Sequence, residues 1–195
     1  MMWRTHLAGG IALTASVLLT LAPHTGQETL GIALLCGAFG SLLPDLDAAD
    51  SKIRRFAPFF GAGKTLGTFR PLALPATVVH TALGHRGAFH SLLAMILVGA
   101  VAAGLCLAAG TPTAVAVPGV GGLTVGFLSH LLLDACTPHG VPFLLPFQRT
   151  RGHVLPRGWR VTTGSLEEDV ALALLTTLCL ALLLPRLMMS QLYLP

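Results

Sequence analysis

Residues 91–133 form a run of 43 positions without a single Asp, Glu, Lys or Arg. A run of this length can cross a hydrocarbon layer of about 30 Å twice, at roughly 20 residues per helical pass. Only 10% of all residues are charged, against ~25% in a typical soluble domain. We therefore expect an integral membrane protein. The chain has 195 residues, which leaves room for one membrane domain, 1–195, and for no separate soluble domain.

Several apolar segments are long enough, or nearly long enough, to cross a membrane. The expected passes are 7–22, 29–43, 91–109, 115–133 and 170–184. In the fourth pass, Pro118 and the glycines after it can break the first helical turns. A further apolar segment, 72–83, contains Pro75 and is too short to span, so it predicts an interfacial or re-entrant piece. The expected fold class is an all-α, polytopic membrane protein with about five short spans.

The basic residues predict the orientation of these passes. Placing the N-terminus in the cytoplasm puts eleven of the 12 Lys and Arg residues on the cytoplasmic side and leaves only Arg186 outside. Cytoplasmic loops of membrane proteins carry this kind of excess. We therefore expect residues 48–86 and 137–166 in the cytoplasm and the C-terminus on the other side.

With this topology, the ionisable side chains gather at the cytoplasmic ends of the passes. A charged side chain within the hydrocarbon costs at least ~2.5 kcal/mol, so such positions are informative. The candidates for a shared site are His6, Asp45, Asp47, His85, His90, His130, Asp134 and Glu168. They come from the ends of all five passes and can therefore meet.

His130 and Asp134 are four residues apart, so on a helix they project from one face and can share a metal ion. An imidazole with a carboxylate is a ligand set that suits zinc, manganese or iron better than calcium or magnesium. The alternative for this pair alone is a histidine that snorkels and an aspartate that faces lipid headgroups.

Two further pairs lie beside neighbouring passes. Asp45 and Asp47 follow a proline at a helix end, and Gly87 permits a bend that turns His85, His90 or both inward. The alternative for the aspartates is a solvated turn, and the alternative for the histidines is a turn at the helix start with one side chain exposed to water. The conjunction of three His/Asp groups on one membrane face favours a metal site.

These motifs together resemble those of a known family, the YdjM-like, LexA-regulated inner-membrane proteins, which are described as metal-dependent hydrolases. The matching motifs cover most of the chain and are Thr5-His6-Leu7, Gly40-Ser41-Leu42-Leu43-Pro44-Asp45-Leu46-Asp47, His85-Arg86-Gly87 with His90-Ser91, Ser129-His130-Leu131-Leu132-Leu133-Asp134, Thr137-Pro138-His139-Gly140-Val141-Pro142 and Thr163-Gly164-Ser165-x-x-Glu168. The chain departs from the family pattern at Ala88-Phe89, where the usual pair ends in Thr. The resemblance implies a location in a bacterial-type inner membrane.

The resemblance also implies an activity. The family is similar to the zinc-dependent phospholipase C and single-strand nuclease group, which implies a di- or trinuclear centre, with zinc expected first and manganese or iron as alternatives. The implied substrate is a membrane lipid or lipid-linked phosphoester. Arg86 would hold two phosphate oxygens, unless it only anchors the loop to the membrane, and Glu168 is the second catalytic candidate.

Two other functions use the same residues. A divalent-metal transporter would need polar groups through the membrane depth, and the outer halves of the passes lack them. A non-catalytic metal-binding membrane protein would need only a closed set of four ligands. We do not expect a nucleic acid partner, because the arginines are scattered and no aromatic stacking platform is present in the sequence. Nothing in the sequence predicts the oligomeric state.

Overall fold

The computed structural model describes residues 1–47 and 88–192, and within these ranges the chain forms helices and no strand. The α-helices and three short 3-10 helices are α1 (Trp3–Leu21), α2 (Gln27–Gly40), η1 (Leu43–Asp47), η2 (Ala88–His90), α4 (Leu92–Ala108), α5 (Thr113–Ala135), η3 (Arg157–Trp159) and α6 (Leu166–Leu192). The predicted all-α class is confirmed. The predicted segment 72–83 lies outside the described residues.

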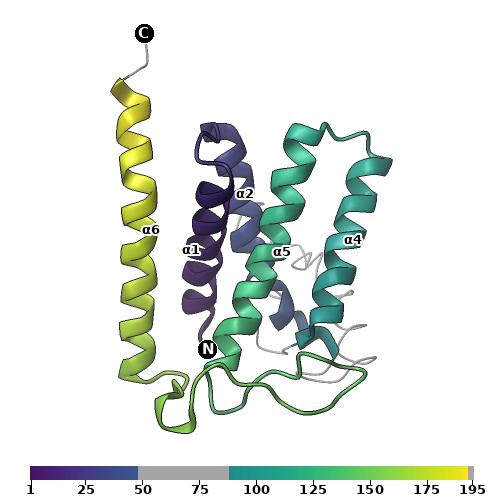
Figure 1. Cartoon of the computed structure of the whole chain (residues 1–195), viewed down its shortest axis with the longest axis vertical. Helices are drawn as coiled ribbons and strands as arrows, with labels where there is room; N and C mark the ends of the chain where they lie inside the picture. Colours follow the sequence, from purple (N-terminus) through teal and green to yellow (C-terminus); the bar gives the residue numbers. More distant parts are fainter. Residues whose placement is uncertain (48–87, 193–195) are drawn as a thin grey trace, which may run out of the picture.

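The helices run side by side, with α1, α2 and α5 in the middle of the bundle (Figure 1). Helix α5 packs against α2, α1 and α4, whereas α6 packs against α1. The N-terminus, the start of α6 and the loop 136–165 all lie at one end of the bundle, and the C-terminus lies at the other (Figure 1). We call the first of these the polar end, because His6, His130 and Asp134 are buried there.

Three of the described helices, α1, α5 and α6, are long and apolar enough to cross a membrane, and α4 is a shorter apolar helix of 17 residues. Helices α5 and α6 differ from the predicted passes. Helix α5 is continuous through Pro118, because a proline near the N-terminal end removes only one intrahelical hydrogen bond. Helix α6 begins at Leu166, before the predicted 170, so Glu168 lies in its first turn, and it continues through Pro185.

Glycines bring α2 and α5 into backbone contact. A Cβ atom added to Gly126 would lie 2.0 Å from the carbonyl oxygen of Gly37, and one added to Gly122 would lie 2.2 Å from that of Ala33. Small residues are the usual means by which helices approach closely in a membrane, where apolar side chains gain little by leaving lipid. Helix α2 ends at Gly40, earlier than the predicted 43, and the chain then turns through Ser41 into η1 beside α5.

The loop 136–165 closes the polar end. The Val154 N–H donates to the carbonyl of Ala135, and the Val161 N–H donates to that of Cys136, each at 3.0 Å, so the loop satisfies carbonyls that the end of α5 leaves open. The Phe143 carbonyl accepts from the Leu92 N–H at 2.9 Å and joins the loop to the start of α4. The loop therefore holds the ends of α4 and α5 together beneath the buried polar residues.

Candidate metal centre

Helix α5 supplies two side chains of the cluster, His130 and Asp134. Both are buried, with His130 fully inaccessible and Asp134 7% exposed. Their spacing of one helical turn places them on one face, as the sequence predicts, and His130 Nε2 lies 3.5 Å from Asp134 Oδ2.

The main chain at the end of α2 orients the His130 ring. His130 Nδ1 lies 2.7 Å from the carbonyl oxygen of Ser41. A carbonyl only accepts, so Nδ1 carries the proton and donates, and in the neutral ring Nε2 carries the lone pair. Nε2 lies 3.7 Å from Asp45 Oδ1 and has no hydrogen-bond partner within the described residues. This arrangement, with one ring nitrogen bonded to a carbonyl and the other free, is typical of a metal-ligating histidine.

Helix α1 brings His6 against the same carboxylate. The His6 ring stacks on the His130 ring, with centroids 3.7 Å apart and planes inclined by 13°. His6 Nε2 lies 3.3 Å from Asp134 Oδ1, and the side chain is 1% exposed. The two imidazoles therefore point their nitrogens at the two oxygens of one aspartate.

The 3-10 helices η1 and η2 add Asp45 and His90. His90 Nε2 lies 3.8 Å from Asp45 Oδ1 and 3.9 Å from Asp134 Oδ2. Burial by itself raises the pKa of the Asp45 carboxyl, but the facing imidazoles of His90 and His130 outweigh it, and the pKa falls to about 2. Asp45 is therefore ionised at neutral pH.

The separations in this cluster fit a shared cation. The nitrogen-to-oxygen distances of 3.3 to 3.9 Å exceed the 2.7–3.2 Å of ordinary N–H···O hydrogen bonds. Two ligands bound to one tetrahedral ion by bonds of ~2.0–2.2 Å lie about 3.4 Å apart. Two sets of ligand atoms each lie within 4.8 Å of one another, His6 with His130 and Asp134, and Asp45 with His90 and His130. The donor set thus fits a divalent ion that accepts nitrogen and oxygen ligands.

Glu168 lies in the first turn of α6 and is buried, but it is not part of either ligand set. Its carboxylate accepts from the Thr5 hydroxyl at 2.9 Å, from the Gly164 N–H at 2.7 Å and from the Met2 N–H. These bonds join the start of α6 to the turn that carries His6. The Met1 amino group contacts the cluster itself, because it donates to Asp134 Oδ1 at 2.8 Å.

Five of the predicted ligands thus come together in the structure: His6, Asp45, His90, His130 and Asp134. The side chains of Asp47, His85 and Arg86 lie outside the described residues. Sequence reasoning missed the carbonyl of Ser41, because a main-chain acceptor leaves no side-chain signal. It also missed the bond from Thr5 to Glu168, although both residues belong to the motifs quoted above.

Comparison with known proteins places the chain in a family. The uncharacterised protein YvsG of Bacillus subtilis is 33% identical over 175 residues, which cover 89% of this chain and 88% of YvsG. The inner membrane protein YdjM of Escherichia coli, like its namesake in Shigella flexneri, is 42% identical over 65 residues, about a third of each chain. No solved structure matches. The family model of the YdjM inner membrane protein matches residues 1–192, from before α1 to the end of α6, and this chain belongs to that family of inner membrane proteins.

Proposed function

We propose that the protein is a membrane-bound, metal-dependent hydrolase of lipid or lipid-linked phosphoesters. The observation that carries this proposal is the His130 ring, whose Nδ1 is fixed by the Ser41 carbonyl and whose Nε2 faces Asp45 and Asp134. A buried lone pair directed at two carboxylates is repelled by them unless a cation lies between. A metal ion is the natural cation for this position.

The described residues provide ligands for two ions. His130 offers one lone pair and can serve one ion, together with His6 and one oxygen of Asp134. His90 faces the other oxygen of Asp134, and Asp45 lies beside His90. These two residues can serve a second ion. When bound, divalent ions activate water and stabilise the charge that develops on phosphate oxygens. Zinc suits this ligand set, and manganese or iron are the alternatives.

The position of the cluster supports a substrate that lies in the membrane. His6 and Asp134 belong to α1 and α5, two helices long enough to cross a bilayer, and lie near the ends of those helices. A phosphoester at the headgroup level of a lipid can reach such a cluster without leaving the bilayer. Arg86, in the segment before η2, is proposed to bind the phosphate through its two-pronged guanidinium.

Transport of a divalent cation is the second candidate. A transit site needs polar groups along the depth of the membrane. In the described helices, acidic and basic residues lie in the terminal turns except Arg186, which lies in the part of α6 away from the polar end, and His6 and His130 lie at the polar end with Asp134. The distribution therefore supports hydrolysis over transport.

We also propose that the polar end faces the cytoplasm, because eleven of the 12 basic residues then lie inside. A cysteine introduced as Thr150→Cys into a cysteine-free variant should react with an impermeant maleimide only after cells are opened. Labelling of this position in intact cells would contradict the orientation.

The activity is tested on purified protein in mild detergent with phospholipids, undecaprenyl-type phosphoesters and soluble phosphodiesters, each with zinc, manganese or iron supplied. His130→Ala is the blank, and His153→Ala, a histidine of the loop 136–165 that is in neither ligand set, is the matched control. We expect turnover by the wild type and by His153→Ala only. Equal rates for the wild type and the blank on every compound would contradict the phosphoesterase and favour transport.

Arg86→Lys separates phosphate binding from metal binding. The variant should keep its metal and lose ~2 kcal/mol of transition-state stabilisation, because a point charge cannot replace a two-pronged donor. Full activity of this variant would remove Arg86 from the site and leave the metal centre unaffected.

A further inference from the structure

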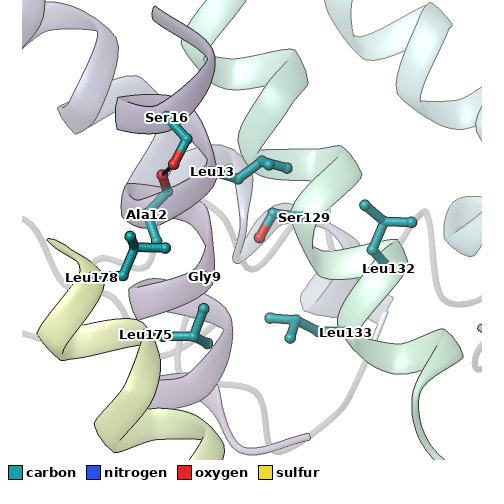
Figure 2. A pocket seen from close by; sticks show the side chains of 9 residues that line it. All are labelled: Gly9, Ala12, Leu13, Ser16, Ser129, Leu132, Leu133, Leu175 and Leu178. Atoms are coloured by element: carbon teal, nitrogen blue, oxygen red, sulfur yellow. Dashed lines mark hydrogen bonds between the residues drawn. The ribbon is translucent and has the colours of Figure 1, made fainter. Parts of the chain in front are cut away.

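A pocket of about 190 Å³ lies between α1, α5 and α6 (Figure 2). Its wall is almost entirely apolar and includes Ala12 and Leu13 from α1, Leu132 from α5, and Leu175 and Leu178 from α6. These residues belong to the three helices that are long enough to span a membrane. The pocket therefore lies at the depth of lipid hydrocarbon chains.

One end of the pocket lies near the candidate metal centre along both α1 and α5. Gly9, which lines it, comes one turn after His6 on α1, and Leu133, which also lines it, directly precedes Asp134 on α5. Gly9 lets the Leu133 side chain pack directly on α1 at this end, since a Cβ at Gly9 would lie 2.5 Å from that side chain. The end of the pocket lined by Gly9 and Leu133 is therefore the end nearer to the ligand cluster.

One polar group in the pocket wall has no partner. Ser129 is 3% exposed, lines the pocket, and its hydroxyl has no hydrogen-bond partner within the described residues. The other serine of the wall, Ser16, donates to the carbonyl of Ala12, and Figure 2 draws that bond. A buried hydroxyl without a partner destabilises the protein, so Ser129 is suited to bond a polar atom of a ligand.

Helix α6 forms an outer wall that leaves the pocket accessible from the lipid. It packs on α1 and has hardly any contact with α5 within the described residues. Leu132 on α5 and Leu178 on α6 are 37% and 43% exposed at the two sides of the pocket. A hydrocarbon chain can therefore enter between α5 and α6 without crossing water.

We infer that this pocket holds one acyl chain of a phospholipid substrate, with its ester oxygen at Ser129 and its phosphate at the metal centre. The inference deepens the proposed function and rests on it. The chain gains little free energy by leaving lipid for an equally apolar pocket, so the pocket serves to align the phosphate with the buried ligands.

The test uses the full-length protein in vesicles of phosphatidylethanolamine and phosphatidylglycerol that contain a trace of phosphatidic acid with a diazirine in one acyl chain. After photolysis, adducts are mapped by mass spectrometry. We expect adducts on Leu13 and Leu132 in excess of those on Val101 and Leu105, which are 62% and 65% exposed on α4. Leu178 lines the pocket but is partly exposed, so Leu178→Trp should fill the pocket without disturbing the buried core. The adducts on Leu13 and Leu132 should then fall to the number found on α4.

Leu174→Trp is the matched control, because Leu174 lies one turn away on α6, is 67% exposed and does not line the pocket. This variant should keep the adducts. Ser129→Ala should weaken retention of the probe by about three- to tenfold, the effect of one hydrogen bond, with unchanged metal content. Adducts spread evenly over all lipid-facing helices would overturn the inference.

Hydrolysis assays distinguish a failure of this inference from a failure of the proposed function. Leu178→Trp should lose turnover of long-chain phospholipid and keep turnover of the soluble diester bis(p-nitrophenyl) phosphate. Equal loss of both would contradict the pocket as an acyl-chain site. Enriched adducts without hydrolysis of any phosphoester would contradict the phosphoesterase and leave a lipid-binding pocket beside a metal centre.

Discussion

Helices α5 and α6 have nearly the same apolar character but different environments. Their most apolar windows have mean hydropathies of 1.6 and 1.8, yet a third of the α5 window is buried within the protein, against 6% of the α6 window. Helix α5 contains Gly122 and Gly126 at its contact with α2, whereas α6 has leucines on all sides. Hydropathy thus indicates that both helices lie in the membrane, and small residues indicate which of them is packed in the protein.

The difference has a consequence for the candidate centre. Its ligands come from α1, α5 and the turns beside them, where backbones approach closely and one ring nitrogen is fixed by a carbonyl. Helix α6 contributes a hydrogen-bonded carboxylate at its start and an apolar wall beyond it. The rigid part of the molecule therefore holds the polar groups, and the loosely packed helix bounds the pocket.

The largest effect is expected at the α2–α5 contact. Gly126→Leu forces a side chain into the backbone of Gly37 and should prevent folding, at a cost of about 3 kcal/mol or more. Gly121→Leu on the same helix meets nothing within 4 Å and should leave the melting temperature unchanged. Size-exclusion chromatography of heated detergent extracts measures both, and equal behaviour of the two variants would contradict the close packing.

The next effect compares one leucine in each helix. Leu131 on α5 is fully buried and Leu174 on α6 is 67% exposed. Leu131→Ala should destabilise the protein by about 2–3 kcal/mol through lost contacts and a cavity, and Leu174→Ala by less than about 0.5 kcal/mol. Reversible unfolding in mixed micelles gives both values. A similar loss in the two variants would indicate that Leu174 is packed as tightly as Leu131 and would contradict its exposure on α6.

The smallest effect concerns a buried attachment of α6 at the polar end, the carboxylate of Glu168. Glu168→Ala removes the acceptor for Thr5 and Gly164 and should cost about 1.5 kcal/mol, whereas Glu167→Ala, next to it and exposed, should leave the stability nearly unchanged. Both changes remove one negative charge from the first turn, so the difference isolates the hydrogen bonds. If the two variants unfold alike in the same assay, Glu168 does not hold α6 to α1.

Much of the fold could be predicted from the sequence because lipid permits few structures. A span without charges predicts a helix wherever it occurs, and all five predicted passes coincide with helices to within a few residues, apart from the C-terminal end of α6. The continuity of α5 through Pro118 was not predicted, because the pattern of residues does not show how near the N-terminal end of the helix the proline lies. The start of α6 was predicted too late, because the sequence does not show that the Glu168 carboxylate is buried at the helix start and bonded to Gly164 and Thr5.

The site could be predicted as a set of residues and not as a geometry. Polar side chains at the ends of apolar helices indicated that His6, His90, His130 and Asp134 meet, and they do. The stacking of His6 on His130 and the bond from His130 to the Ser41 carbonyl depend on how three helices cross, which no spacing along one segment determines. The pocket was not predicted, because Ser129 and Leu178 are ordinary residues until α6 lies beside α1.

Binding of metal by the buried His/Asp cluster is tested by the metal content of protein purified in mild detergent. The content is measured by mass spectrometry as ions per chain. His130 belongs to both ligand sets, so one substitution affects both. We expect at least one zinc, manganese or iron ion per wild-type chain, the same value for His153→Ala, and near-complete loss in His130→Ala. A wild-type protein without bound metal after all three ions are supplied, or a His130→Ala variant with the wild-type content, would contradict metal binding by the cluster.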